Sequence, residues 1–193
     1  MTPLKVLSTL GLALATAAIA TSASADSWGD TESNPIDGTG PHPDGSIHTY
    51  CFEPMDTSVH DNIVAAEDNA LDAETQANVS FDSSCDYSGG TETDVVWDTA
   101  NLSGSLRGTS WCEDWDNGLC DQSYVELDVA ELNVGSNDEL DTTKTACHEL
   151  GHTVGLTHHS SGYGCMLSGE IPSTDLQWRR YVAHHKDHIN AWF

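Results

Sequence analysis

Residues 146–166 read ACHELGHTVGLTHHSSGYGCM and gather four histidines, one glutamate and two cysteines in 21 residues. The first half of this stretch predicts a helix. On that helix His148 and His152 are four residues apart, so both imidazoles leave the same face one turn apart. Glu149 lies beside the first histidine and can reach the far side of an ion held by the two rings. The stretch therefore predicts one site at which these side chains meet.

A third ligand is expected from the turn that follows. Gly155 suits a left-handed helix end and lets the chain turn sharply, so His158 can return toward the two helical histidines. Three imidazole nitrogens leave the fourth tetrahedral position of zinc for water, which catalytic rather than structural zinc requires. His159 is an alternative to His158, although the spacing favours His158. The other alternative is that these are ordinary helix histidines that face solvent.

The longer string H-E-x-x-H-x-x-G-x-x-H at residues 148–158, followed by Met166, resembles the metzincin superfamily of zinc metallopeptidases. The resemblance is specific over about residues 141–166. It implies an α+β fold with a mixed, twisted sheet of about five strands, an active-site helix, an irregular lower subdomain and a C-terminal helix. It also implies the zinc ligands His148, His152 and His158, the general base Glu149, and Met166 as the turn methionine beneath the metal.

Two details of the motif concern the subfamily. Some metzincins carry a tyrosine two residues after the turn methionine, but Ser168 stands there, so no tyrosine ligand is expected. His159 follows the third ligand and leaves the subfamily open between matrixin-like and small secreted bacterial types. A propeptide cysteine-switch motif is not found, because Cys51, the only cysteine near the N-terminus, lies in a predicted strand.

The expected activity is zinc-dependent endopeptidase hydrolysis of proteins or peptides. Zinc would lower the pKa of a water molecule towards ~7, and Glu149 would accept its proton and later deliver it to the leaving amine. Two alternatives remain: a non-catalytic module stabilised by zinc, and a disulfide-stapled exported protein without metal. A structural zinc site has no need for a base, so Glu149 argues against the first alternative.

The N-terminus predicts secretion. Residues 1–25 have the charged start, the 15-residue apolar run and the small-residue end of a signal peptide, with cleavage expected after Ala25. A retained membrane anchor is the alternative, but the run is shorter than the ~20 residues that span a bilayer. Residues 26–45 are rich in Asp, Gly, Pro and Ser and predict a flexible arm or short propeptide. Residues 46–193 are then expected to form a single catalytic domain.

The cysteines support an extracellular location. All six follow the expected signal peptide, and an even number in an exported chain predicts three disulfides. Six cysteines allow 15 pairings, so spacing only suggests the partners. The expected pairs are Cys51 with Cys85, Cys112 with Cys120, and Cys147 with Cys165. The last pair would tie the motif helix to the methionine turn.

The charge of the chain restricts its partners. The formal net charge is −25, and it becomes −26 without residues 1–25, which hold one lysine and no acid. Nucleic acid and anionic membrane surfaces are therefore excluded as partners, and we expect a monomer that acts on proteins or peptides. Calcium has only weak support, because the acids of DWDNG (114–118) do not fall at the spacing of an EF-hand. A second metal at His184 and His188 is likewise weaker than a solvated helix face.

The remaining pattern predicts the order of elements. Strands are expected at 46–53, 78–81, 93–99 and 123–132, and a helix at 57–76. The segment 100–121 is expected to be irregular. The motif helix should begin with Asp141 or Thr142 as its cap, and a C-terminal helix should begin near Ser173 or Thr174. The strand at 123–132 is a candidate edge strand for an extended substrate, with an interior position as the alternative.

Overall fold

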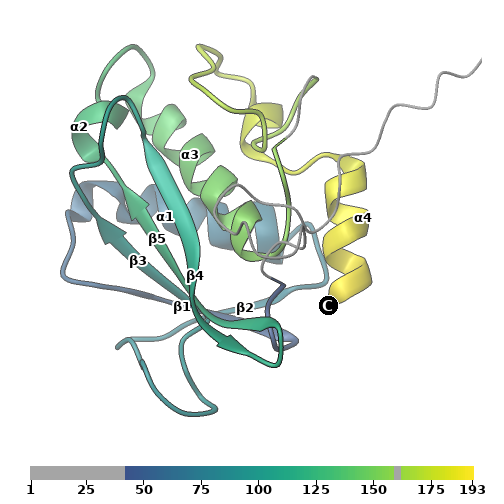
Figure 1. Ribbon diagram of the computed structural model, residues 1–193. Coiled ribbons are helices and arrows are strands. Elements are labelled where there is room, and N and C mark those ends of the chain that lie inside the picture. Colours follow the sequence, from purple (N-terminus) through teal and green to yellow (C-terminus); the bar gives the residue numbers. More distant parts are fainter. Residues whose placement is uncertain (1–41, 159–161) are drawn as a thin grey trace, which may run out of the picture.

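The computed structural model of the chain describes residues 42–158 and 162–193, and a single mixed sheet lies at its centre (Figure 1). The order of the strands is β2-β1-β3-β5-β4, in which the first four run parallel and β4 pairs antiparallel at the edge. The strands are β1 (Ile47–Phe52), β2 (Asn78–Phe81), β3 (Val95–Thr99), β4 (Gly108–Asp116) and β5 (Leu119–Leu127). The expected α+β class with a five-stranded mixed sheet is confirmed.

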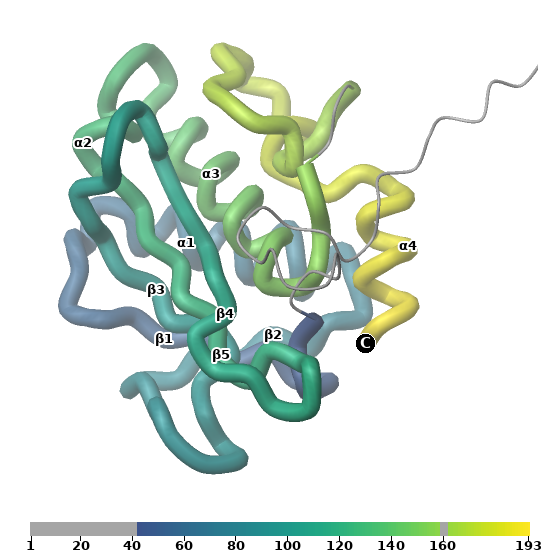
Figure 2. The backbone as a smooth tube through the Cα atoms, in the orientation of Figure 1, coloured from purple at the N-terminus to yellow at the C-terminus, as the bar shows by residue number. Residues whose placement is uncertain are grey.

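The helical segments lie mainly on one side of this sheet. They are η1 (Thr57–Val59), α1 (His60–Ala66), the π-helix η2 (Glu67–Asp72), α2 (Val129–Leu132), α3 (Asp138–Thr153), η3 (Leu176–Arg179) and α4 (Ala183–Trp192). Figure 2 follows the same backbone and shows α3 between the strands and the C-terminal segment that carries α4. The motif helix α3 therefore occupies the middle layer of the molecule.

The hydrophobic core joins the sheet to α1 and α3. Successive side chains of a strand point to opposite faces, so Trp97 of β3 and Val125 and Leu127 of β5 share one face. Ile63 of α1 and Leu150 of α3 pack against this face, and all five side chains are fully buried. Burial of such apolar surface holds α3 rigidly beside the sheet.

The expectation of an irregular segment over 100–121 is wrong. Strand β4 occupies 108–116, and β5 already begins at 119. Asn117 and Gly118 join them with φ values of 52° and 86°, a two-residue turn that matches the twist of a hairpin. The strand was missed because the outer half of β4 is exposed and acidic and lacks apolar alternation. The Asn-Gly pair was the available signal.

The strand expected over 123–132 ends earlier and lies elsewhere in the sheet. It ends at Leu127, because the Asp128 carboxylate accepts hydrogen bonds from the backbone N–H groups of Ala130 and Glu131 and so caps α2. Strand β5 lies between β3 and β4, so it is not the candidate edge strand and has the interior position that was the alternative. The edge beside α3 is β4.

Helix α3 begins three residues before the expected cap at Asp141 or Thr142. Asn137 precedes it in a left-handed conformation with φ 66°. Asp141 lies inside the helix instead, where it is buried and forms an ion pair with Arg107. The predicted end is confirmed, because α3 stops at residue 153 and Gly155 has φ 89°.

The C-terminal helix is shorter than expected. Ser173 and Thr174 do not cap it; the short helix η3 starts after Asp175, and α4 starts only at residue 183. The chain between them is extended, because the side chain of Tyr181 is buried and its hydroxyl donates to the Cys147 carbonyl at 3.0 Å. This tertiary contact with α3 interrupts the helix.

The cysteines lie at disulfide distance in the three pairs that spacing suggests. One bond joins β1 to the loop after β2, one closes the β4–β5 hairpin, and one joins α3 to the segment before Met166. The pairs are Cys51–Cys85, Cys112–Cys120 and Cys147–Cys165. The first and third bonds link cysteines 34 and 18 residues apart in the sequence, and the second spans the hairpin turn.

The described chain starts at His42, near the end of the expected arm 26–45. The ring of His42 stacks on Trp192 at a centroid distance of 4.1 Å, and the Trp192 indole donates to the Pro43 carbonyl at 2.9 Å. The backbone N–H of Cys120 also donates to the His42 carbonyl at 2.8 Å. The expected signal peptide and His159 lie outside the described residues. Among the described residues, no helix is long and apolar enough to cross a membrane.

Candidate metal centre

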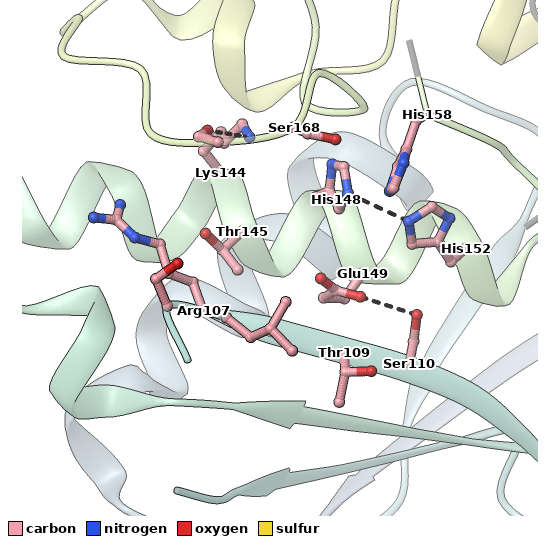
Figure 3. A pocket seen from close by; sticks show the side chains of 14 residues that line it. Arg107, Thr109, Ser110, Lys144, Thr145, His148, Glu149, His152, His158 and Ser168 are labelled. Carbon is pink, nitrogen blue, oxygen red and sulfur yellow. Dashed lines mark hydrogen bonds between the residues drawn. The ribbon is translucent and has the colours of Figure 1, made fainter. Parts of the chain in front are cut away.

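Helix α3 presents His148 and His152 from one face, and the turn after it brings His158 to the same place. The turn is closed by the backbone N–H of Leu156, which donates to the Gly151 carbonyl at 2.9 Å. The three imidazoles converge (Figure 3), with ring centroids 4.8–4.9 Å apart. One nitrogen of each ring lies within 4.8 Å of the others. The structure therefore brings together the three histidines that the motif nominates.

Backbone carbonyls orient two of the three rings. Nδ1 of His148 lies 2.8 Å from the Cys165 carbonyl oxygen, and Nδ1 of His152 lies 2.8 Å from the Leu156 carbonyl oxygen. A carbonyl can only accept, so both Nδ1 atoms carry the proton and both Nε2 atoms present a lone pair. Burial lowers the pKa of His152 to about 4 and that of His148 well below its usual value. Both rings are therefore neutral ligands.

This arrangement fits a bound metal cation. The two Nε2 atoms are 3.3 Å apart, and with both Nδ1 atoms protonated neither Nε2 has a hydrogen to donate to the other. Two facing lone pairs in a buried site repel each other unless a cation lies between them. Three imidazoles are a donor set that zinc favours, and the carbonyl partners of His148 and His152 are the outer interactions that normally fix such rings.

Glu149 projects from α3 toward β4 and lies beside the histidines (Figure 3). Its side chain is 6% exposed, and its Oε2 accepts a hydrogen bond of 3.0 Å from the Ser110 hydroxyl of β4. Burial raises the pKa of the Glu149 carboxyl to about 7, whereas the Ser110 hydrogen bond and the Lys144 charge act in the opposite direction. Gly108 makes room for this carboxylate, because a Cβ there would lie 2.8 Å from its Cγ.

Met166 lies beneath the histidine helix. It is fully buried, and its side chain fills the space over Gly151, where a Cβ would lie 2.9 Å from the Met166 Cε. The neighbouring Cys165 is bonded to Cys147 and also supplies the carbonyl that orients His148. Met166 therefore packs directly against the motif helix, and its role as a turn methionine stays a prediction.

A cleft of about 520 Å³ opens beside the three histidines. Its walls are the edge of β4 from Gly108 to Ser110, one face of α3 from Lys144 to His152, and the loop at Ser168 and Gly169. Sequence reasoning missed Ser110, because the segment around it was expected to be irregular. It also missed Lys144, although a residue four positions before His148 lies on the same helical face.

The sequence gives two further metal sites only weak support, one at DWDNG (114–118) and one on α4. Asp114 of the DWDNG segment does approach Glu92 and Asp121, with carboxylate oxygens within 4.8 Å of one another. Burial and the neighbouring acids raise the pKa of Asp121 to about 6. The rings of His184 and His188 have centroids 6.4 Å apart. Calcium therefore keeps the weak support that the sequence gave it, and for His184 and His188 a solvated helix face stays the prediction.

Comparison with known proteins shows a likeness in fold. No protein-family model matches the sequence, and no curated protein sequence matches it either. Among solved structures, archaemetzincin from Methanopyrus kandleri superposes with a TM-score of 0.50 and 17% sequence identity. The match covers 77% of this chain and 97% of archaemetzincin. The sheet and helices that frame the three histidines are therefore arranged in a fold similar to that of archaemetzincin.

Proposed function

We propose that this protein is a secreted zinc-dependent endopeptidase in which Glu149 acts as the general base. The observation that carries the proposal is the meeting of three imidazoles with a buried carboxylate at the wall of an open cleft. Similarity of the fold to archaemetzincin supports it, as does the HExxHxxGxxH motif with its methionine. A purely structural zinc site would have no use for Glu149 or for the cleft.

His148, His152 and His158 would hold the metal through one nitrogen each. A bound zinc ion supplies Lewis acidity, which polarises a peptide carbonyl and makes water a stronger acid. The backbone carbonyls of Cys165 and Leu156 keep the first two rings in the tautomer that binds metal. Met166 and the Cys147–Cys165 bond support the helix from below.

Glu149 would move the proton. One oxygen of the Glu149 carboxylate accepts a hydrogen bond from the Ser110 hydroxyl, which holds the carboxylate toward the cleft. The other oxygen takes a proton from the attacking water. The water oxygen then bonds to the peptide carbon, and the carbon–nitrogen bond breaks. Glu149 passes the proton to the departing nitrogen, so the products are a carboxylate and an amine. A carboxyl whose pKa lies near neutrality suits both transfers.

Strand β4 is the surface on which an extended substrate would lie. It pairs with β5 on one side, and no strand of the described part of the chain pairs with its other edge. Gly108, Thr109 and Ser110 of β4 line the cleft that holds Glu149. A peptide that adds to this edge would place its backbone beside the proposed base and the metal site.

The remaining properties of the proposal follow from the sequence. We propose that residues 1–25 are a signal peptide, that 26–45 are an arm or short propeptide, and that 46–193 are the catalytic domain. The three disulfides suit an oxidising, extracellular environment. Proteins or peptides are the proposed substrates of a monomeric enzyme, and nucleic acid and membranes are not proposed partners.

The test compares casein cleavage by the purified, disulfide-bonded protein with cleavage by its Glu149→Ala form. Zinc is measured on the same samples. We expect one zinc per chain in both proteins and a loss of activity of roughly 10²–10⁴-fold in the variant, the usual contribution of general acid–base catalysis. Thr174→Ala, at an exposed position before η3, is the control and should keep full activity.

Each other outcome has a distinct meaning. Equal zinc without cleavage by the unmodified protein would favour the zinc-stabilised binding module. A folded protein without zinc would refute the metal site. Full activity in Glu149→Ala would refute the assigned base while leaving the peptidase intact.

A further inference from the structure

The cleft holds an unusual share of the positive charge of the protein. The chain has six lysines and arginines against 31 acidic residues, and five of the six lie among the described residues. Two of the five, Arg107 and Lys144, line the cleft beside Glu149. The other three lie elsewhere: Arg180 and Lys186 pair with Glu74. Arg179 donates to the backbone carbonyls of Leu140 in α3 and of Ser173 and Asp175.

The charge of Arg107 is already compensated. Its guanidinium forms ion pairs with Asp141 and, at 3.2 Å, with Glu170, and it donates to the Val134 carbonyl at 2.8 Å. These bonds join the start of β4, the start of α3 and the loop after Met166. Arg107 therefore builds the far end of the cleft rather than offering a free charge.

Lys144 differs, because its partners are neutral. Its side chain is 3% exposed, and its ammonium group donates to the carbonyls of Leu167 and Gly169. Two acceptors leave the third N–H of the ammonium available. Among the described residues no carboxylate lies within ion-pair distance of it. Glu149 acts on Lys144 only through its charge and without a direct ion pair, so an anion that enters the cleft and contacts the ammonium group would gain from it.

Most of the residues that line the cleft have polar side chains, and five of them carry hydroxyl groups: Ser105, Thr109, Ser110, Thr145 and Ser168. The Ser110 hydroxyl is already bonded to Glu149. A cleft lined by hydroxyl groups and a buried ammonium group suits a small anionic group, whose oxygens can accept hydrogen bonds from them.

We propose that this cleft binds a carboxylate of the substrate next to the bond that is cut, with Lys144 as the specificity-determining residue. The carboxylate comes from an acidic side chain or from the C-terminus of the peptide. This inference rests on the proposed peptidase function of the same site. The net charge of −25 repels acidic peptides at long range, so the preference for a substrate carboxylate acts only within the cleft. Salt screens the long-range repulsion and should make this preference easier to measure.

The experiment uses pairs of quenched fluorescent peptides that differ in one group. One series replaces Glu by Gln at each position within three residues of the cut, and a second compares a free C-terminus with a C-terminal amide. Charge-assisted hydrogen bonds are about twice as strong as neutral ones, so we expect roughly tenfold higher kcat/KM for the charged member of a pair. The two series distinguish the two sources of the carboxylate.

Lys144→Gln tests the residue. The amide keeps an N–H donor for the neighbouring carbonyls but removes the charge, so the ratio within each peptide pair should fall to about one while zinc content stays the same. Lys144→Met should do likewise. The matched control is Lys186→Gln, which removes one positive charge from α4, where the lysine pairs with Glu74, and should keep the ratio.

Several results would overturn the proposal. They are an equal rate for both members of every pair in the unmodified protein, and a retained ratio in Lys144→Gln. If no peptide is cut although zinc is bound, the peptidase function fails instead. Binding of the same fluorescent peptides to the unmodified protein, measured by anisotropy, then decides the carboxylate site by itself. Should both Lys144 variants fail to fold, the ratio in the unmodified protein remains decisive.

Discussion

Gly151 of α3 and Met166 contact each other so closely that a methyl group on Gly151 would overlap the Met166 sulfur and lie 2.9 Å from its Cε. Met166 is fully buried, and Tyr181 lies 3.1 Å from the same position, so neither neighbour has room to retreat. The glycine inside the motif helix is therefore a packing requirement. It lets the methionine lie directly against the helix that carries His148 and His152.

Gly151→Ala is expected to destabilise the protein by about 1–3 kcal/mol, the usual cost of forcing an extra methyl group into a packed core. It should also weaken zinc binding, because α3 must shift relative to the loop that carries His158. Thermal unfolding and a zinc titration measure the two effects. Gly90→Ala is the control, since no atom lies within 4 Å of a Cβ there. Equal stability of the two variants would contradict the packing argument.

Ser110→Ala should lower activity without changing zinc content. The Ser110 hydroxyl donates to Glu149 at 3.0 Å, and its loss leaves a buried carboxylate with one partner fewer. Loss of a hydrogen bond to a charged group costs about 1.5–3 kcal/mol, so we expect kcat to fall roughly 10–100-fold. Ser80→Ala, at an exposed position of β2, is the matched control. A similar loss in both variants would point to a general effect on the sheet.

The disulfides offer a second matched comparison. Replacing both Cys147 and Cys165 by alanine opens a loop of 18 residues, and replacing both Cys112 and Cys120 opens one of 8. Loop closure predicts a loss of about 2–3 kcal/mol in each case. Only the first pair should also lower zinc affinity, because the Cys165 carbonyl orients His148. Denaturant unfolding and a zinc titration separate the two effects; unchanged affinity in the first variant would show that the carbonyl keeps its position without the bond.

A buried polar group beneath the sheet predicts how stability depends on pH. Glu67 of the π-helix η2 is fully buried, and its Oε1 accepts from the Trp97 indole at 2.9 Å. Its Oε2 lies 3.8 Å from Nε2 of His48, which is also fully buried. Burial raises the pKa of Glu67 to about 8 and lowers that of His48 to about 4. Both directions favour the neutral forms, so we treat the contact as a neutral pair rather than an ion pair.

Glu67→Gln should therefore gain stability relative to the unmodified protein as pH rises. The folded pKa of Glu67 lies above its unfolded value near 4.5, so its contribution is complete below about pH 4.5 and is lost as pH rises through 8. Between pH 5 and 8 the free energy of unfolding of Glu67→Gln, relative to that of the unmodified protein, should rise by more than about 1.4 kcal/mol, the equivalent of one pKa unit. Urea unfolding with chelator present measures it without a contribution from metal. A variant that is less stable at pH 7 would indicate an ion pair with His48.

Local spacing accounts for much of the candidate site. The four-residue interval between His148 and His152 suffices to place them on one helical face, and the glycine at 155 accounts for the return of the chain toward His158. The strands β1, β2 and β3 could also be predicted, because their β-branched and aromatic residues lie between turn formers. The cysteine pairs follow largely from neighbouring positions in the chain.

The apolar pattern of the sequence did not predict strand β4 or the interruption of the C-terminal helix. Strand β4 carries exposed acidic residues, so its pairing with β5 depends on a hairpin turn and not on an apolar pattern. The contact of Tyr181 with α3 interrupts the C-terminal helix, although the sequence there has helical spacing.

The sequence by itself determined which side chains are able to hold a metal and on which helix they lie, because helical geometry repeats within a few residues. Only the tertiary structure decided that β4 forms the edge of the cleft, that Ser110 holds Glu149, and that Lys144 faces neutral carbonyls. These relationships join segments 23–39 residues apart, and no local pattern specifies the distance between such segments once the chain has folded.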